Sequence, residues 1–198
     1  NLIKSIKNDV NFVFFPYEAY MLYSIAKSQQ ELDGDMAEVG VYQGGSAKLI
    51  CEVKGDRKLF LFDTFIGLPE LSDIDTHFGK KHWKKNQFND TSLEAVKDYL
   101  SLYENVDIIK GEFPKTADNI RNSKFSFVHL DVDLYEPTKE SLNFFYPKLA
   151  EGGVIVCDDY NFSTFPGAKK AWDEYFQDKK KNCKLFYETP FGGCFIIK

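Results

Sequence analysis

The sequence predicts a single α/β domain, 1–198, built on a mostly parallel seven-stranded sheet with an antiparallel last strand and helices on both faces. Short apolar runs alternate with helical stripes, which is the pattern of a parallel sheet covered on both sides. With 198 residues, 43% of them hydrophobic, the chain can bury one sizeable core. The last two apolar runs are joined by a few residues only, which is too short for a parallel crossover.

Seven apolar runs are expected to be strands, and the turn around Pro190 should join the last two as an antiparallel hairpin. Between the fourth and fifth runs, four apolar residues have the i, i+3, i+4, i+7 spacing of a helical face. Pro137 suits the first turn of this helix, and Gly152 with Gly153 should end it. The result is one right-handed βαβ unit. The strands are expected near 35–41, 58–63, 106–110, 125–131, 152–158, 183–188 and 193–198, and the helical face comprises Leu142, Phe145, Tyr146 and Leu149.

Two segments lie outside this alternation. In the N-terminal helical segment, 1–30, residues 12–30 are expected to form one helix rich in Tyr and Phe. It would pack on the sheet or on a partner subunit, so a homodimer is one expectation. Residues 67–89 lack periodicity, and a loop of this length is typical of a functional lid or of disorder; we expect a lid over the acceptor. Thr91 to Glu94 then resembles a capping box that opens a helix.

Composition narrows the class of protein. A net charge of -5 with interspersed signs argues against nucleic-acid binding and favours a small-molecule substrate. No stretch approaches the roughly 18 apolar residues of a membrane span, and no basic and apolar leader opens the chain. The cysteines lack C-x-x-C spacing and three lie in apolar runs, which indicates reduced thiols and a cytoplasmic location. They are Cys51, Cys157, Cys183 and Cys194.

Acidic residues directly follow two of the expected strands. Asp131 and Asp133 follow one apolar run, and Asp158 and Asp159 follow the next. Open α/β sheets hold their ligands at the carboxyl ends of neighbouring strands. Three carboxylates that converge there can hold a hard cation such as Mg2+. Adjacent acids at the end of a buried strand repel each other unless a cation or a helix terminus compensates them.

A glycine-rich turn follows the first expected strand. Its spacing is E-x-G-x-x-x-G from Glu38 to Gly44, which disfavours the G-x-G-x-x-G pattern of an NAD-linked oxidoreductase. Gly40 permits a close turn, and Gly44 with Gly45 would let a ligand approach the backbone at the start of a helix. Asp63 ends the second strand, where it is placed to accept ribose hydroxyls or to cap the next segment.

Several ordered motifs over about residues 35–176 resemble the macrocin O-methyltransferase family of sugar methyltransferases. They are LFDTFIGLP at 61–69, GEFPKT at 111–116, LDVDLYEPT at 130–138, YPKL at 146–149, GG at 152–153, CDDY at 157–160 and PGAKKA at 166–171. The resemblance implies a Rossmann-like class I fold that uses S-adenosylmethionine with Mg2+. It implies methylation of a hydroxyl on a sugar in a natural product or glycan.

The resemblance also implies roles for individual positions. Asp131 would be a metal ligand, and Asp131 or a nearby base would remove the proton of the acceptor as the catalytic group. Catechol-type relatives carry a lysine base three residues after the first metal aspartate, and here that position is Leu134, so a lysine base at that site is excluded. The implied cofactor-binding residues are Glu38, Gly40, Tyr42, Gly44, Ser46, Asp63 and Thr64, and the implied metal ligands are Asp131, Asp158 and Asp159.

Some alternatives stay open at this stage. Asp133 lies on the same side of an extended strand as Asp131, so either could face the ion. His129 could assist proton transfer or could be a hydrogen-bonded core residue. The acceptor could be a catechol-like phenol, with or without a metal, and a non-catalytic ligand-binding subunit is a further reading that the acidic cluster argues against.

Overall fold

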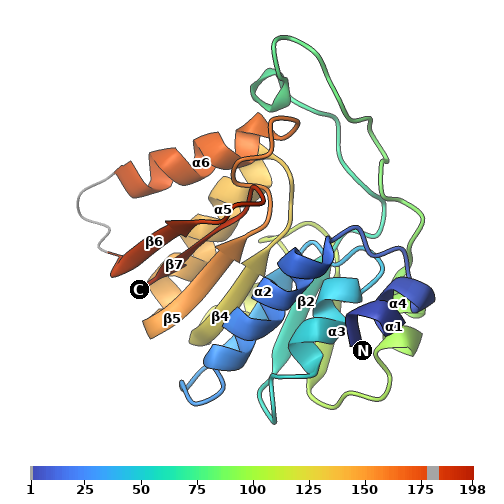
Figure 1. The fold of residues 1–198 in the computed structure, drawn as a ribbon, viewed down its shortest axis with the longest axis vertical. Coiled ribbons are helices and arrows are strands. Elements are labelled where there is room, and N and C mark those ends of the chain that lie inside the picture. Colours follow the sequence, from blue (N-terminus) through green and yellow to red (C-terminus); the bar gives the residue numbers. More distant parts are fainter. Residues whose placement is uncertain (1, 178–182) are drawn as a thin grey trace.

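One mixed seven-stranded sheet forms the centre of the protein in this computed structural model, which describes residues 2–177 and 183–198 (Figure 1). The strand order is β3-β2-β1-β4-β5-β7-β6, and β7 is antiparallel to both of its neighbours. The predicted sheet and its antiparallel last strand are confirmed. The strands are β1 Asp35–Val39, β2 Leu59–Asp63, β3 Val106–Lys110, β4 Phe125–Leu130, β5 Leu149–Cys157, β6 Leu185–Glu188 and β7 Cys194–Ile197.

Helices cover both faces of the sheet (Figure 1). Alternation along β2 shows the two layers, because Leu61 belongs to one buried cluster and Phe62 to the other. The Leu61 cluster lies under α1, α2, α3 and α4, and the Phe62 cluster lies under α5 and α6. The helices are α1 Leu2–Asp9, α2 Pro16–Ser28, α3 Gly45–Cys51, α4 Leu93–Tyr99, α5 Tyr135–Phe145 and α6 Pro166–Gln177.

The helix before β5 ends earlier than the sequence predicts. α5 stops at Phe145, and a 3-10 turn, Tyr146–Lys148, follows it. Pro147 explains this end, since proline lacks an N–H and restricts the residue before it. Gly152 and Gly153, predicted to stop the helix, lie inside β5. The four residues of the predicted helical face are nevertheless all buried.

The N-terminal segment forms two helices, so the prediction of one helix over 12–30 is wrong in its bounds. α2 starts at Pro16, where a missing N–H is tolerated, and the Phe15 N–H donates to a Glu18 carboxylate oxygen at 2.7 Å. Residues 10–15 therefore run as an extended strap between α1 and α2. At α4 the N-cap is Ser92, whose hydroxyl accepts from the Ala95 N–H, one residue later than the predicted capping box.

The segment 67–89 is an irregular arm beside α6, as its lack of periodicity predicts (Figure 1). It contains one 3-10 turn, Asp73–Asp75, and is anchored where the Tyr135 N–H donates to Asp75 at 2.8 Å. Trp83 stacks on Phe165 with ring centroids 5.1 Å apart. Its role as a lid stays a prediction.

The structure also bears on two further expectations, that the chain has no membrane-spanning helix and that its cysteines are reduced thiols. Among the described residues, no helix is long and apolar enough to cross a membrane. All four cysteines are free thiols, and three of them are buried, which agrees with the expected reduced state.

Candidate functional site

The candidate site lies where β1, β4 and β5 end side by side. Gly40 follows β1, Asp131 follows β4, and Asp158 follows β5. The three strands are neighbours in the parallel part of the sheet, so their carboxyl ends meet at one edge. This is the edge at which open α/β sheets bind ligands.

Gly40 is required by the close approach of two strand ends. Its φ is +88°, and a Cβ atom placed there would lie 1.7 Å from the carbonyl oxygen of Asp131. Any side chain would therefore push the turn after β1 away from the end of β4. Gly40 thus fixes the distance between the glycine-rich turn and the acidic residues.

We expect Gly40→Ala to lower the free energy of unfolding by about 3 kcal/mol or more, because it combines a backbone clash with a left-handed φ. Chemical denaturation measures this loss. Gly55→Ala is the matched control, since Gly55 also has a positive φ, +61°, but has no atom within 4 Å of the added Cβ. It should cost only about 1 kcal/mol. Equal losses in both variants would contradict the close approach.

The next two glycines serve packing in this structure. A Cβ on Gly44 would lie 3.3 Å from the Tyr99 ring, and a Cβ on Gly45 would lie 2.5 Å from the Phe12 ring. The protein's own side chains thus occupy the Cβ side of these glycines, and the approach of a ligand to their backbone stays a prediction. Ser46, in the first turn of α3, is also buried.

Asp63 organises the glycine-rich turn. One carboxylate oxygen accepts from the Val41 N–H at 2.7 Å and the Tyr42 N–H at 2.8 Å, and the other accepts from the Phe65 N–H at 2.7 Å. The hydrogen bond from Phe65 is the one expected if Asp63 caps the segment that follows β2. Each oxygen has about two acceptor positions, so the oxygen facing Phe65 retains one. Thr64 follows directly, and its hydroxyl accepts from the Ile66 N–H at 3.4 Å.

Tyr42 joins the turn to two distant segments. Its φ is +52°, an uncommon left-handed conformation for a residue with a side chain. Its hydroxyl accepts from Asn11 at 2.9 Å and donates to Asp90 at 2.8 Å. The Thr91 hydroxyl donates to the Tyr42 carbonyl. No pattern in the sequence indicated Asn11 or Asp90, because these contacts span many residues of chain.

Glu38 and His129 form a buried pair between adjacent strands. The two residues are register partners on β1 and β4, and the His129 Nδ1 lies 2.7 Å from a Glu38 carboxylate oxygen. Both side chains are 0% exposed. His129 is therefore a hydrogen-bonded core residue, as one of the two sequence-based alternatives predicted. Glu38 Oε2 and His129 Nε2 have no hydrogen-bond partner within the described part of the chain.

Three aspartates converge beside this pair. Asp131, Asp133 and Asp159 each place one carboxylate oxygen within 4.8 Å of the other two, and the Asp133 N–H donates to Asp159 at 2.9 Å. Asp158 lies outside this group, although the sequence placed it among the ligands. Asp158 and Asp159 both lie in the turn that follows β5, and only Asp159 places a carboxylate oxygen in this group. Asp133 joins the group because its φ of +63° turns the chain after β4.

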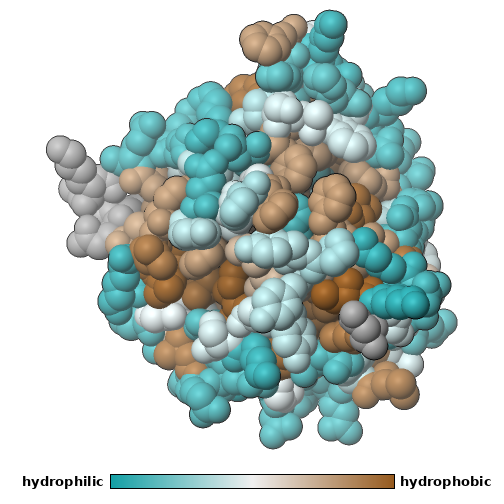
Figure 2. Space-filling model, viewed as in Figure 1, coloured by the Kyte–Doolittle hydropathy of each residue, from teal (hydrophilic) through white to brown (hydrophobic). Residues whose placement is uncertain are grey.

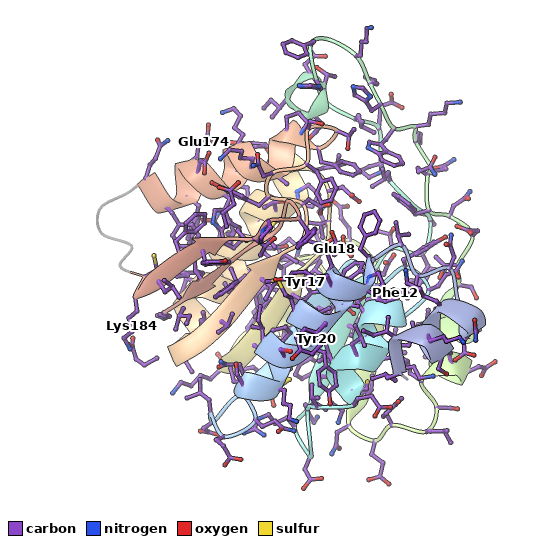
Figure 3. All side chains as sticks on the ribbon, in the orientation of Figure 1. Phe12, Tyr17, Glu18, Tyr20, Glu174 and Lys184 are labelled. Carbon is purple, nitrogen blue, oxygen red and sulfur yellow. The ribbon has the colours of Figure 1, made fainter. Side chains whose placement is uncertain are left out.

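The cluster is electrostatically unfavourable by itself. Burial raises the pKa values of Asp131 and Asp133 well above the usual range, and the neighbouring carboxylates raise them further. Burial also raises the pKa of Asp159 to about 6 and that of Asp158 to about 7. The charges of Asp159 and of Glu18, which Figure 3 shows on the first turn of α2, raise the pKa of Asp158 further, and Asp158 in turn raises that of Asp131. Such a cluster favours a cation among its carboxylates.

A cavity of about 600 Å³ lies along α6, and its lining includes Tyr160, the residue after Asp159, but no residue of the acidic group. One wall holds a polar triad in which the Lys169 ammonium donates to the Tyr160 hydroxyl at 2.8 Å and to Asp173 at 2.9 Å. Burial raises the pKa of Tyr160 to about 12. The cavity is lined by His77, Tyr160, Asn161, Phe162, Ser163, Pro166, Lys169, Lys170, Asp173, Glu174 and Gln177. No sequence pattern indicates this cavity, because its walls come from the arm, the loop after β5 and α6.

Comparison with known proteins places the chain among O-methyltransferases. It is 31% identical to the demethyldecarbamoylnovobiocin O-methyltransferase of Streptomyces niveus, over 72% of this chain and 58% of that protein. It is 30% identical to the 8-demethyl-8-(2,3-dimethoxy-alpha-L-rhamnosyl)-tetracenomycin-C 4'-O-methyltransferase of Streptomyces olivaceus, over 64% of this chain and 53% of that protein. The chain thus spans little more than half the length of these relatives.

The fold also matches a solved structure, that of the O-methyltransferase NovP, with a TM-score of 0.76 at 24% identity over 91% of this chain and 79% of that one. At this identity the likeness shows the fold alone. The family model of the macrocin-O-methyltransferases (TylF) matches residues 23–187, which is most of the chain. The protein therefore belongs to the macrocin-O-methyltransferase family.

Proposed function

We propose that this protein is an S-adenosylmethionine-dependent O-methyltransferase that acts on a sugar hydroxyl of a natural product or glycan and uses Mg2+. The observation that carries the proposal is the convergence of Asp131, Asp133 and Asp159 beside the glycine-rich turn. Family membership supports the reaction class. The name of the Streptomyces olivaceus relative, which methylates a rhamnosyl compound, supports a sugar acceptor.

The residues present fit the proposed metal. The group offers carboxylate oxygens, the ligands that Mg2+ prefers, and a cation would offset their mutual repulsion. Asp131 and Asp159 belong both to the ligand set that the sequence implies and to the group in the structure. We take Asp133 as the third ligand on geometric grounds, in place of Asp158. When bound, Mg2+ would supply Lewis-acid polarisation of acceptor oxygens.

The residues also fit the proposed cofactor, which when bound would supply a reactive methyl group. Asp63 retains an acceptor position suited to a ribose hydroxyl. Glu38 Oε2 is a buried acceptor that has no hydrogen-bond partner among the described residues. Buried acceptors are normally hydrogen-bonded, so this oxygen could accept a hydrogen bond from the cofactor. The remaining proposed cofactor residues, Gly40, Tyr42, Gly44, Ser46 and Thr64, shape or continue the turn that these two acids flank.

The mechanism assigned to the chain's own residues is positioning and proton removal. The turn and Asp63 would orient the methyl donor, and the acidic group would orient the acceptor beside it. Asp131 would accept the proton of the acceptor hydroxyl. The position that holds a lysine base in catechol-type relatives is Leu134 in this chain, a buried apolar residue that cannot take a proton. The arm 67–89, anchored through Trp83 on Phe165, would exclude water. The free cysteines support the proposed cytoplasmic location.

An acceptor screen tests this function. Purified protein with S-adenosylmethionine and Mg2+ would be offered glycosides, nucleotide sugars, catechols and carboxylic acids, and methyl transfer would be read by mass spectrometry. We expect transfer to a sugar that carries neighbouring hydroxyls, because two adjacent oxygens suit a chelating cation. Turnover of catechols alone would replace the sugar assignment by the catechol alternative. Retention of a nicotinamide dinucleotide by the purified protein would contradict the reaction class.

A further inference from the structure

β6 is an exposed edge strand. It is the last strand of the sheet and, among the described residues, pairs only with β7. Three of its four residues are large and apolar, and Leu185, Phe186 and Tyr187 are 43%, 41% and 46% exposed. Short edge strands usually carry charges or a covering segment, because an uncovered apolar edge is a template for pairing with another chain.

The hairpin geometry shows which backbone groups of β6 face outward. The Thr189 N–H donates to the Gly193 carbonyl at 2.8 Å, and the Gly193 N–H donates to the Thr189 hydroxyl at 3.1 Å, so the backbone groups of these two residues face each other. Hydrogen-bonded and non-bonded pairs alternate along an antiparallel ladder. Counting back, Tyr187 and Leu185 direct their N–H and C=O groups toward β7. Phe186 and Glu188 therefore direct theirs away from the sheet.

The face of the sheet on the α2 side adds apolar surface next to this edge. Leu185 and Tyr187 adjoin Phe195, whose ring lies 5.4 Å from the Tyr187 ring. Figure 2 shows hydrophobic side chains gathered over β5, β7 and β6. On α2, Tyr17 packs on Phe191 of the hairpin with ring centroids 4.4 Å apart. Contiguous apolar surface of this kind marks interaction sites more often than scattered apolar residues do.

We propose that β6 pairs with β6 of a second copy of this chain, antiparallel about a two-fold axis at Phe186. The sequence of the strand and the residue before it, Lys184-Leu185-Phe186-Tyr187-Glu188, is complementary to itself in this arrangement. Lys184 lies opposite Glu188 of the partner subunit, Leu185 opposite Tyr187 of the partner subunit, and Phe186 opposite Phe186 of the partner subunit. Opposite charges and apolar or aromatic pairs directly across two strands are the favourable combinations.

The register follows from both the backbone and the charges. With Phe186 on the axis, its outward N–H and C=O groups meet the same groups of the partner subunit and exchange two hydrogen bonds. A shift of register separates Lys184 from the partner subunit's Glu188, so the charges select this alignment. Lys184, which Figure 3 shows at the outer end of the sheet, now pairs with Glu151 at 3.1 Å on the exposed surface. Exposed pairs of this kind contribute little, and an ammonium has further donors.

Charge exchange tests the pairing, with molar mass measured by light scattering after size-exclusion chromatography over a concentration series. Lys184→Glu and Glu188→Lys should each raise the dissociation constant of the dimer about tenfold or more, because each puts like charges opposite each other twice. The double variant should restore the dimer. Mixing the two single variants should give a heterodimer, since their charges complement each other again.

Lys58→Glu is the matched control for Lys184→Glu. Lys58 also forms an exposed ion pair, with Asp107 at 3.9 Å, but precedes β2. It should leave the dimer unchanged. Hydrogen exchange on the unmodified protein gives an independent test, because the Phe186 amide should become protected as concentration rises. A monomer at every concentration, a failure of the double variant to restore the dimer, or an unprotected Phe186 amide would overturn the proposal. None of these readouts depends on methyl transfer, so they are independent of the proposed function.

Discussion

Replacing Asp159 by Asn is expected to lower turnover by roughly 100-fold or more while leaving cofactor binding intact, because Asp159 links both other members of the acidic group. Asp131→Asn should have at least as large an effect, since it would remove a ligand and the proposed base together. The rate of methyl transfer, measured at saturating S-adenosylmethionine over a Mg2+ series, gives the size of each loss. Calorimetric titration with S-adenosylhomocysteine checks that the cofactor half is intact.

A pair of further variants identifies the third ligand. Asp133 lies within the group in the structure, whereas Asp158 lies outside it. We therefore expect Asp133→Asn to raise the Mg2+ concentration needed for half-maximal rate, and Asp158→Asn to raise it less. The reverse order would restore Asp158 as the ligand that the sequence implied. Unchanged Mg2+ dependence in all four variants would remove the metal site.

Asp63→Asn is expected to weaken binding of S-adenosylmethionine about 10- to 150-fold, the effect of losing a hydrogen bond to a charged group. The amide would also turn an N–H group toward backbone N–H donors of Val41, Tyr42 or Phe65. Calorimetry measures the loss. Asp56→Asn, on an exposed turn, is the control and should bind like the unmodified protein.

A cofactor analogue without ribose hydroxyls separates the two roles of Asp63. If Asp63 contacts the ribose, the unmodified protein should lose affinity for this analogue, and Asp63→Asn should lose little more. If Asp63 only orders the turn, the analogue and the substitution should weaken binding additively. Strict additivity would therefore withdraw the ribose contact and keep the structural role.

The sheet could be predicted from the sequence because its signals are local. Apolar runs with glycine and proline between them identify strands, and the short link at Pro190 requires a hairpin. The start of α2 also has a local signal, because Pro16 begins the helix. Residues 12–15 are largely apolar, however, and so were included in the predicted helix. Periodicity correctly identified Leu142 and Phe145 as buried residues of α5, but Tyr146 and Leu149 lie beyond its end, because Pro147 ends the helix sooner.

The details of the site depend on contacts that no local pattern contains. Alternation along the chain kept both Asp131 and Asp133 as candidate ligands, but it did not indicate that both enter the acidic group or that Asp133 has a left-handed backbone. Gly45 accommodates Phe12 from the N-terminal strap, so the reason for that glycine lies far away in the chain. The cavity beyond Asp159 likewise joins three segments that only the folded chain brings together.

The proposed reaction is tested by methyl transfer from isotopically labelled S-adenosylmethionine to a glycoside, followed by mass spectrometry in chelator and after restoration of Mg2+. We expect a labelled methyl ether on a sugar oxygen, absent in chelator and recovered with Mg2+. Transfer at the full rate in chelator would contradict the role of the acidic group. No transfer to any glycoside under either condition would contradict the proposed function itself.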